Sequence, residues 1–273
     1  MFKLTLKKGE EKRILSGHPW VYANEVAKID GKDVQGSIAR VESHDGRFAG
    51  LGFINHASKI IVRILAQNEV AIDRDFFFGR IKAANDYRLS VGYTDNYRAV
   101  FGESDLLPGL IVDRYGDCLS VQFLAYGMDC RKDMIVDILR EIFSPVCIYE
   151  RSDVSVRSKE GLKETKGVLY GALPDSLVIT ENGVKLSIDL VNGQKTGYFL
   201  DQKENRDNLK HYVKGKRVLD LFCNQGGFSL AAAHYGAEEI TAVDISRTAL
   251  EQVGKNAELN GFLNIATREA DVF

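Results

Sequence analysis

Residues 216–245, KRVLDLFCNQGGFSLAAAHYGAEEITAVDI, decide the fold class of this chain. They contain the four parts of a βαβ module in order, namely a first strand, a glycine turn, a helix and a second strand, at residues 218–222, 223–227, 228–235 and 240–243. The whole unit is about 30 residues long, the usual size of such a module. The stretch therefore predicts a βαβ module with two parallel strands.

The turn of this module has the features of a nucleoside site. Gly226 and Gly227 stand at the mouth of the predicted helix, where residues without a side chain let a ligand approach the backbone. Asp244 ends the second strand, and a carboxylate there accepts hydrogen bonds from a ribose diol. We therefore expect a cofactor that carries a nucleoside. An ordinary glycine turn without a ligand is the alternative.

Two cofactors compete for this site. A dinucleotide site needs the spacing G-x-G-x-x-G, and the turn CNQGGF does not have it. Asp220, at the end of the first strand, would repel the phosphates of a dinucleotide. The same carboxylate suits S-adenosylmethionine, which carries a cationic sulfonium and no phosphate. S-adenosylmethionine is therefore the predicted cofactor.

The composition is that of a soluble globular protein. The chain has 273 residues, 45% hydrophobic and 27% charged, which is enough for two domains or more. It has no apolar run of about eighteen residues and no apolar segment after MFKLTLKKGEEKR, so we expect neither a membrane span nor a signal peptide, and a cytoplasmic location. The net charge of -2 argues against a basic surface over the whole molecule, although a local basic face stays open.

The cysteines indicate neither a metal site nor disulfides. The four cysteines form no C-x-x-C pair and have no nearby histidine partner. The sequence predicts no metal, and buried free thiols at Cys118, Cys130 and Cys147.

Residues 1–70 are predicted to form a small β-rich domain. Strands are expected at residues 2–6, 37–42, 47–54 and 59–65. Basic side chains gather near aromatic ones at Lys7, Lys8, Lys12, Arg13, His18 and Trp20. This combination suits contact with the RNA backbone together with base stacking. A solvated charge run over a buried Trp explains the residues equally well.

Residues 72–191 are predicted to form a central α+β domain. Helices are expected at residues 72–92 and 130–143, and strands at 109–115, 118–123, 146–149 and 168–171, followed by a hairpin at 176–190. The remaining segment, residues 192–273, holds the βαβ module. It starts with GQKTGYFLDQKENR, residues 193–206, whose density of aromatic and charged residues is typical of a ligand-facing loop.

Several separate strings of this sequence resemble one known family. RAVFGESDLLPGLIVDRYGD, YERSDVSVR, GQKTGYFLDQKENR and VLDLFCNQGGFSLAAA follow in this order behind a start that contains GHPWVY. The chain is similar, over nearly its whole length, to bacterial class I methyltransferases of the 23S ribosomal RNA large-subunit methyltransferase I type. The resemblance implies a multidomain α/β and α+β protein: a PUA-like barrel that binds RNA, a central α+β domain, and the first half of a Rossmann-like methyltransferase domain.

The resemblance also implies a set of cofactor-binding residues. The glycine turn corresponds to the family's first cofactor motif, with Asp220, Phe222, Asn224, Gly226 and Gly227. The ribose and adenine would be held by Asp244, Ile245, Ser246, Asp271 and Val272. The 193–206 loop would close the site with Lys195, Thr196, Tyr198, Phe199, Asp201 and Gln202, and with Arg206 as a further candidate.

The sequence departs from the family pattern in its catalytic motifs. The family methylates carbon 5 of a cytosine with a Cys nucleophile that adds to carbon 6 and an Asp-Pro-Pro acid, and neither motif is found up to Phe273. Cys223 is expected to be a packed turn residue. We therefore expect a fragment without a catalytic residue, with an open apolar edge at strand 218–222 and weak or no binding of S-adenosylmethionine.

Several functions stay open at this point. Methylation of a cytosine in 23S ribosomal RNA is the first hypothesis, and methylation of another base, such as guanine, is the second. A noncatalytic RNA-binding fragment is the third, and a homodimer stays open as the assembly. A dehydrogenase is disfavoured because the dinucleotide spacing is absent.

Overall fold

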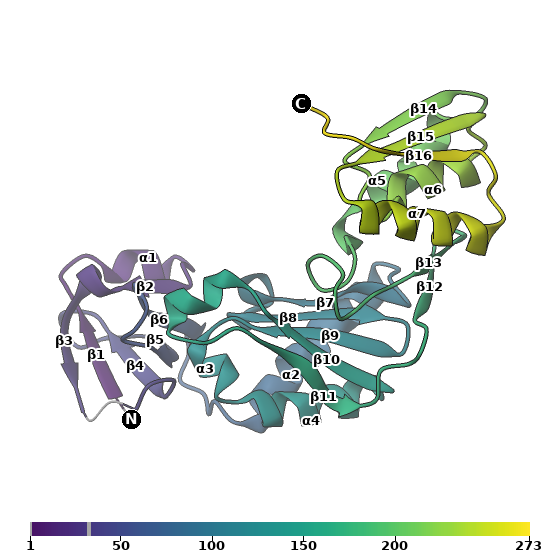
Figure 1. The fold of residues 1–273 in the computed structure, drawn as a ribbon. Coiled ribbons are helices and arrows are strands. Elements are labelled where there is room, and N and C mark those ends of the chain that lie inside the picture. Colours follow the sequence, from purple (N-terminus) through teal and green to yellow (C-terminus); the bar gives the residue numbers. More distant parts are fainter. Residues whose placement is uncertain (1, 32–33) are drawn as a thin grey trace. The chain divides into compact units, whose positions relative to one another are not determined.

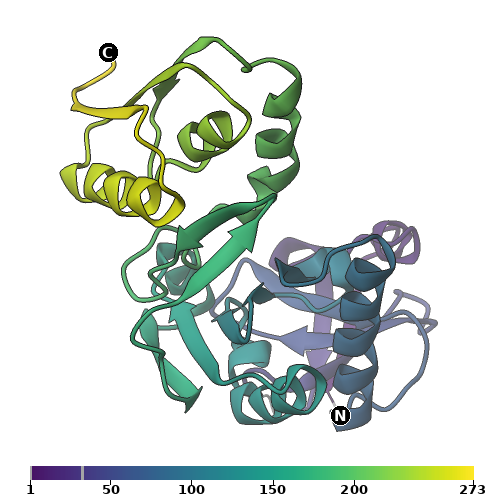
Figure 2. The ribbon, with the colours of Figure 1, turned by 90° about the vertical axis from the view of Figure 1, so that its right-hand side faces the viewer.

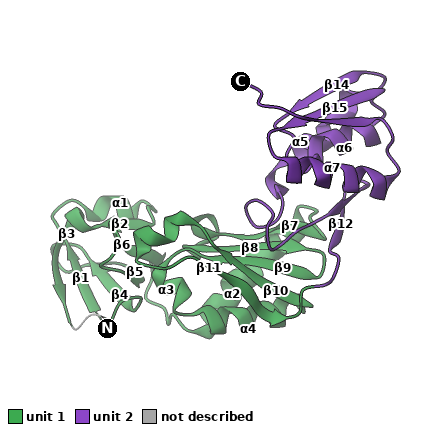
Figure 3. Ribbon diagram, in the orientation of Figure 1, with its two compact units in different colours: residues 1–173 green, residues 174–273 purple. Residues whose placement is uncertain are grey.

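The computed structural model describes residues 2–31 and 34–273 (Figure 1, and Figure 2 after a turn of 90°). The chain divides into two compact units, Met1–Leu173 and Pro174–Phe273 (Figure 3). No helix in the described ranges combines the length and the apolar character that crossing a membrane requires.

The first part of the first unit is a six-stranded sheet with the strand order β2-β6-β5-β4-β1-β3. Its strands are β1 (Phe2–Leu6), β2 (Trp20–Tyr22), β3 (Val26–Asp30), β4 (Ile38–Glu42), β5 (Phe48–Ile54) and β6 (Ile60–Ala66), with α1 (Glu11–Leu15) and η1 (Ala23–Glu25) between them. Alternate residues such as Leu4, Leu6 and Val41 are fully buried in its core. The four predicted strands are confirmed. The pattern did not reveal β2 and β3, because β2 has three residues and β3 has no fully buried one.

The rest of the first unit is a five-stranded sheet with the order β11-β10-β9-β8-β7. Its elements are α2 (Arg74–Ser90), β7 (Asn96–Phe101), η2 (Gly102–Asp105), β8 (Leu110–Tyr115), β9 (Cys118–Phe123), α3 (Tyr126–Asp129), α4 (Lys132–Phe143), β10 (Cys147–Ser152), η3 (Ser155–Glu160) and β11 (Thr165–Gly171). Phe77 and Ile81 of α2 and Leu139 of α4 pack in the same core as the strands. The predicted helix at residues 130–143 is wrong at its start. Cys130 and Arg131 lie between the end of α3 and the start of α4 at Lys132.

The second unit starts with a hairpin and ends with a three-stranded parallel sheet. Its elements are β12 (Val178–Glu181), β13 (Val184–Ser187), η4 (Leu200–Gln202), α5 (Lys203–Asn208), η5 (Leu209–His211), β14 (Arg217–Leu221), α6 (Gly227–His234), β15 (Glu239–Asp244), α7 (Arg247–Asn260) and β16 (Ile265–Glu269). The strands lie in the order β14-β15-β16 with parallel pairing. The predicted βαβ module and hairpin are confirmed.

The connections of this sheet explain which of its faces is covered. Two successive right-handed crossovers that advance in the same direction place both helices on one face of the sheet, and Figure 1 shows α6 and α7 on the same side. The opposite face is open within the unit. Leu219 and Leu221, which alternate with the inward Val218 and Asp220, are 63% and 44% exposed. As predicted, β14 is an edge strand.

Two glycines of the first unit test how tightly it is packed. A Cβ at Gly52 of β5 would lie 2.3 Å from the backbone oxygen of Arg63, whereas a Cβ at Gly79 of α2 would meet nothing within 4 Å. We expect Gly52→Ala to lower the free energy of unfolding of this unit by about 2 kcal/mol or more. Gly79→Ala should raise it by about 0.5–1 kcal/mol, because alanine favours the helix. The fluorescence of Trp20, the single tryptophan, follows this unit in urea titrations. Equal stability of the two variants would contradict the packing described for β5 and β6.

Candidate functional site

The turn between β14 and α6 has an unusual backbone. Phe222 and Asn224 have φ angles of 58° and 52°, and Gly226 has a φ of 80°. The left-handed region is sparsely populated by residues other than glycine, and such strain is found preferentially at ligand sites. The turn is fixed by the backbone N–H of Cys223, which donates to the oxygen of Val243 at 3.0 Å. The turn therefore holds a defined, strained shape at the end of the two strands.

The two glycines of the turn are required by close packing. A Cβ at Gly226 would lie 2.9 Å from a methyl carbon of Val253 on α7. A Cβ at Gly227 would lie 2.5 Å from the hydroxyl oxygen of Tyr198, in the 193–206 loop. The glycine pair thus lets both α7 and the loop approach the start of α6.

The two carboxylates at the strand ends bind different segments: Asp220 binds the first turn of α6, and Asp244 binds the glycine turn and the residue before α7. Oδ2 of Asp220 accepts hydrogen bonds from the backbone N of Ser229 at 3.1 Å and from its Oγ at 2.6 Å. Oδ2 of Asp244 accepts one from the backbone N of Asn224 at 2.9 Å, and Oδ1 accepts one from that of Ser246 at 2.9 Å. A carboxylate has about four acceptor positions, so both groups keep acceptor capacity for a ligand.

Burial and mutual repulsion act on Asp220. Burial raises the pKa of the Asp220 carboxyl, the hydrogen bonds from Ser229 oppose this, and the charge of Asp244 adds to it. A cation beside the pair would favour the ionised form, and a phosphate would be repelled. The electrostatics of the strand ends therefore suit a cationic ligand.

The 193–206 loop lies against the turn. Thr196 and Tyr198 are 1% and 4% exposed, and Lys195 pairs with Asp201 at 2.9 Å. The ammonium of Lys195 also lies 4.2 Å from the centre of the Phe199 ring. Loop and turn enclose a cavity of about 280 Å³, lined by Tyr198, Phe199, Gln202, Arg206, Phe222, Cys223, Asn224, Gln225, Gly227 and Phe228.

A buried ion pair fixes this loop. Nε and Nη2 of Arg206 donate to Oε1 and Oε2 of Glu181 at 2.6 and 2.9 Å, and both side chains are 3% exposed. Nη2 also donates to the oxygen of Phe199 at 2.9 Å. The guanidinium lies 4.6 Å from the centre of the Tyr198 ring and 5.9 Å from that of Phe228. Glu181 was not predicted from the sequence, because the hairpin that carries it has no local signal for a buried ion pair.

Cys223 is packed in the turn and is 6% exposed. Burial raises the pKa of its thiol to about 12, and the charges of Asp220 and Asp244 add to this. A thiol with such a pKa is almost entirely protonated at neutral pH and is a poor nucleophile. Burial and protonation therefore make the Cys223 thiol unsuited to nucleophilic attack on a base.

The remaining predicted cofactor residues do not line the cavity, namely Lys195, Thr196, Asp201, Asp220, Gly226, Asp244, Ile245, Ser246, Asp271 and Val272. Ile245 and Ser246 are exposed at the start of α7, where Ser246 caps the helix by accepting from the backbone N of Ala249 at 3.3 Å. Asp271 and Val272 follow β16, and Oδ1 of Asp271 accepts from the backbone N of Phe273 at 3.1 Å. The structure brings the turn and the loop together, and it places these four residues along the neighbouring strand ends.

The predicted RNA-binding cluster is only partly available. Nζ of Lys7 donates to the oxygen of Asn24 at 2.7 Å, and Arg13 forms an ion pair with Glu25. Lys8 and Lys12 are exposed and form no ion pair with the described residues. His18 and Trp20 pack edge to face, with ring centres 5.9 Å apart.

Trp20 is neither free nor fully buried. It is half-buried, and its Nε1 donates to Oε1 of Glu103 at 3.0 Å. Across the described ranges, no three or more His, Cys, Asp or Glu side chains gather in a way that could hold a metal ion.

The comparisons with known proteins agree with this architecture. Residues 4–67 match the family model of a PUA-like domain, and residues 164–267 match that of an S-adenosylmethionine-dependent methyltransferase. The chain is 43% identical to ribosomal RNA large subunit methyltransferase I of Aeromonas hydrophila, over 94% of this chain and 66% of the relative. It is 44% identical to the protein of the same name of Shewanella amazonensis, over 99% of this chain and 70% of the relative. The chain thus spans about two thirds of the length of these relatives.

Solved structures share the fold. A Streptococcus mutans protein described as a SAM-dependent methyltransferase aligns with a TM-score of 0.82 at 24% identity, over 100% of this chain and 72% of that one. A methyltransferase structure in complex with SAH aligns with a TM-score of 0.84 at 24% identity, over 100% and 71%. The predicted fold class is confirmed.

The ion pair of the loop gives a prediction for stability. Glu181→Gln leaves the Arg206 guanidinium buried without its counter-charge, which should lower the free energy of unfolding of the second unit by about 3 kcal/mol. Glu239→Gln is the matched control, because Glu239 pairs with Arg217 at 2.8 Å on an open surface where the side chains are 57% and 80% exposed. The control should change stability by less than about 1 kcal/mol. Hydrogen exchange of the amides of β14–β16 measures the stability of both variants. Similar exchange rates in the two variants would show that the buried pair does not stabilise this unit more than the exposed one.

The thiols give a second prediction. Cys130 is exposed, so the buried thiol predicted at this position is wrong. Iodoacetamide at about pH 8 should therefore alkylate Cys130 well before Cys223, which is buried with a pKa of about 12. Peptide mass spectrometry over time gives the rate at each cysteine. Rapid alkylation of Cys223 in the folded chain would be evidence for an activated thiol and against the packing described here.

Proposed function

The chain belongs to the family of the bacterial ribosomal RNA large subunit methyltransferases I, and from this we propose that it serves the S-adenosylmethionine-dependent methylation of ribosomal RNA. The family is S-adenosylmethionine-dependent, in agreement with the predicted cofactor. The proposal for this chain concerns where the cofactor binds and which RNA group receives the methyl.

The observation that carries the proposal is the pair of carboxylates at the ends of β14 and β15. Asp220 and Asp244 both hydrogen-bond to the turn or to the start of α6, and their repulsion helps to raise the pKa of Asp220. Bound S-adenosylmethionine supplies an electrophilic methyl group on a sulfonium, whose positive charge such carboxylates attract. A Cβ at Gly227 would collide with Tyr198, so no residue with a side chain fits at this position of the turn.

The remaining roles follow from position. Asp244 keeps acceptor positions for two ribose hydroxyls, and the turn at Asn224 and Gly226 offers backbone for the methionine part. The adenine would lie along the strand ends, near Ile245, Ser246, Asp271 and Val272. The 193–206 loop, held by Arg206 and Glu181, would exclude water from the site. These residues bind and orient the donor.

The finer proposal is that the acceptor is carbon 5 of a cytosine in 23S ribosomal RNA. That carbon becomes nucleophilic when a thiolate adds to carbon 6 of the ring. Cys223 does not suit this role, because burial keeps its thiol protonated and its side chain packs with Ala242, Leu250 and Val253. The 273 residues contain no Asp-Pro-Pro sequence. The proposal therefore assigns these residues to cofactor and RNA binding and gives none of them the nucleophilic role.

The RNA contacts are proposed for the first unit. Lys8, before α1, and Lys12, within it, are exposed. Lys7 and Arg13 extend the same basic group although each has an internal partner. Unpaired lysines attract the phosphate backbone without regard to sequence. His18 and Trp20 lie next to this group and supply aromatic surface.

Cofactor binding gives the test of this proposal. Asp244→Ala removes the acceptor for the ribose hydroxyls and frees the turn at Asn224, so it should weaken the binding of S-adenosylmethionine about tenfold or more. Equilibrium dialysis with tritiated S-adenosylmethionine measures even weak binding to the chain. NAD⁺ should not compete, because its phosphates meet the two carboxylates.

The matched control is Glu251→Ala, which removes an exposed carboxylate of α7 that pairs with Arg247. It should leave the dissociation constant within about twofold. Equal binding by the Asp244 and Glu251 variants, or displacement of the label by NAD⁺, would reject the glycine turn as the S-adenosylmethionine site.

A further inference from the structure

A second and larger cavity lies within the first unit. It has a volume of about 670 Å³, within the range of about 300–1,000 Å³ that small-molecule sites occupy. One side is formed by β2, β6 and the turn before β6, and the other by η2, η3 and the backbone near Gly109. Its lining residues are Trp20, Ala57, Ser58, Lys59, Ile60, Arg63, Glu103, Gly109, Leu124, Val156, Lys159 and Glu160.

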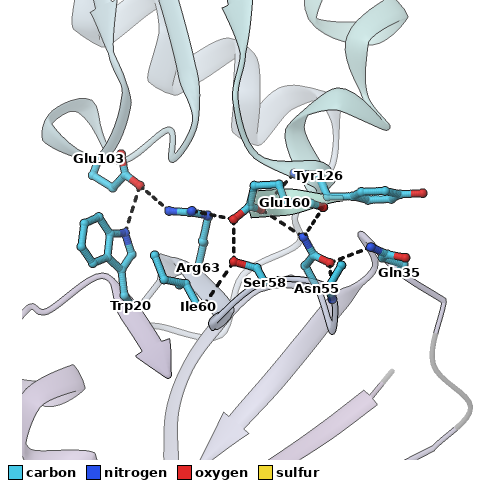
Figure 4. A network of polar contacts seen from close by, with 10 residues as sticks. Trp20, Gln35, Asn55, Ser58, Ile60, Arg63, Glu103, Tyr126 and Glu160 are labelled. Carbon is cyan, nitrogen blue, oxygen red and sulfur yellow. Dashed lines mark hydrogen bonds and ion pairs between the residues drawn. The ribbon is translucent and has the colours of Figure 1, made fainter. Parts of the chain in front are cut away.

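A network of charged side chains fixes the residues of this cavity (Figure 4). Arg63 donates from Nη1 to Oε1 of Glu103 at 3.0 Å and from Nη2 to Oε1 of Glu160 at 2.8 Å. Trp20 donates from Nε1 to the same oxygen of Glu103 at 3.0 Å. The indole ring is therefore held in one orientation by a carboxylate from the opposite wall.

The two glutamates differ in what they leave free. Both oxygens of Glu160 are used, Oε1 by Ser58 and Arg63, and Oε2 by Asn55 and the backbone N of Tyr126. Glu160 is 2% exposed and is part of the framework. Glu103 uses only Oε1, and its Oε2 has no hydrogen-bond partner among the described residues. The side chain of Glu103 is 30% exposed, and Glu103 is one of the residues that line the cavity.

The network also leaves a donor unused. Nε of Arg63 is buried and has no hydrogen-bond partner in the part of the chain that the structure describes. Few buried donors remain unpaired in native structures. The Arg63–Glu103 ion pair thus includes one acceptor, Oε2 of Glu103, and one donor, Nε of Arg63, that have no partner among the described residues.

The rim of the cavity is basic. Lys59 and Lys159, from opposite walls, are exposed, and neither forms an ion pair with the residues described. Three cations and two carboxylates line the cavity, so its net charge is positive although the interior presents a free carboxylate oxygen. This charge distribution suits a ligand whose anionic group lies at the rim of the cavity and whose hydrogen-bond donors enter the cavity.

We propose that this cavity takes a single unpaired nucleobase of the RNA, stacked on Trp20, with its amino-bearing edge donating to Glu103. This proposal depends on the proposed function in one respect only, namely that the ligand is RNA. Apolar walls at Ile60, Leu124 and Val156 suit the faces of a planar ring, and base stacking on an aromatic side chain is a general device of single-strand recognition. Lys59 and Lys159 then contact the flanking phosphates.

The free carboxylate oxygen decides which bases fit. Guanine presents two adjacent donors, N1–H and N2–H, and cytosine presents its N4 amino group, which carboxylates accept. Uracil presents one N–H between two carbonyl oxygens, and both oxygens would be repelled by Glu103. Guanine, with two adjacent donors, should therefore bind more tightly than cytosine or adenine, which each present one amino group, and uracil should bind most weakly.

Trp20 supplies the readout, because it is the only tryptophan of the chain. The 273-residue chain is titrated with the pentaribonucleotides UUGUU, UUCUU and UUUUU, with tryptophan quenching and the anisotropy of 5′-labelled RNA recorded in parallel. We expect quenching by UUGUU and, more weakly, by UUCUU, and an affinity for UUGUU about tenfold above that for UUUUU. UUUUU should bind through its backbone alone and leave the fluorescence unchanged.

Two variants separate the parts of the site. Glu103→Gln keeps the size of the side chain and an acceptor for Trp20, but it loses the charge and should reduce the preference for UUGUU to about twofold or less. Lys59→Ala combined with Lys159→Ala should weaken the binding of all three RNAs by a similar factor and lower the salt dependence. Glu141→Gln is the matched control, because it removes one exposed carboxylate that pairs with Arg74 in the same unit. It should bind like the unaltered chain.

The outcomes distinguish this inference from the proposed function. RNA binding by anisotropy without quenching of Trp20 would overturn the inference, as would equal quenching by all three pentamers. A preference for UUGUU that Glu103→Gln leaves intact would also overturn it. Each of these results stands apart from S-adenosylmethionine binding, which is measured on the second unit. Equal binding of S-adenosylmethionine by the Asp244→Ala and Glu251→Ala variants, with an intact preference for UUGUU, would instead reject the proposed cofactor site and leave the base site in place.

Discussion

The strained turn between β14 and α6 is the constraint on which the second unit depends. Phe222 and Asn224 are left-handed although they carry side chains, and this conformation costs free energy that the surroundings must offset. The offset comes from the Asp244 carboxylate, which accepts from the backbone N of Asn224, and from the close contact of Gly226 with Val253. Because strand ends, turn and two helices share these contacts, the shape of the turn is set by the whole unit.

The loop before the sheet is held to this turn by charge. Arg206 and Glu181 are 25 residues apart and both are buried, so their attraction is opposed by a large desolvation cost. The geometry is bidentate, and the guanidinium also lies against the Tyr198 ring and binds the oxygen of Phe199. The pair therefore gives the loop one defined position beside the glycine turn, which an apolar contact of the same size would specify less strictly.

The first unit also contains an arginine that pairs with carboxylates from distant segments. Arg63 joins Glu103 and Glu160 across the boundary between the six-stranded sheet and the elements that follow it (Figure 4). Here one carboxylate is saturated and the other is not, so one group serves the framework and the other remains available to a ligand. In both units an arginine with little exposed surface is paired with a carboxylate from a distant segment.

Local patterns in the sequence were enough to predict individual strands, helices and turns. The apolar runs and glycine pair of residues 216–245 specified β14, α6 and β15, because periodicity and turn chemistry act over a few residues. The same logic revealed four strands of the first sheet and the hairpin at β12 and β13. The partners of the charged side chains could not be predicted in this way. Arg63 and Glu160 are 97 residues apart, and Trp20 and Glu103 are 83 apart. No local pattern encodes such pairs, because they exist only where separate elements pack together.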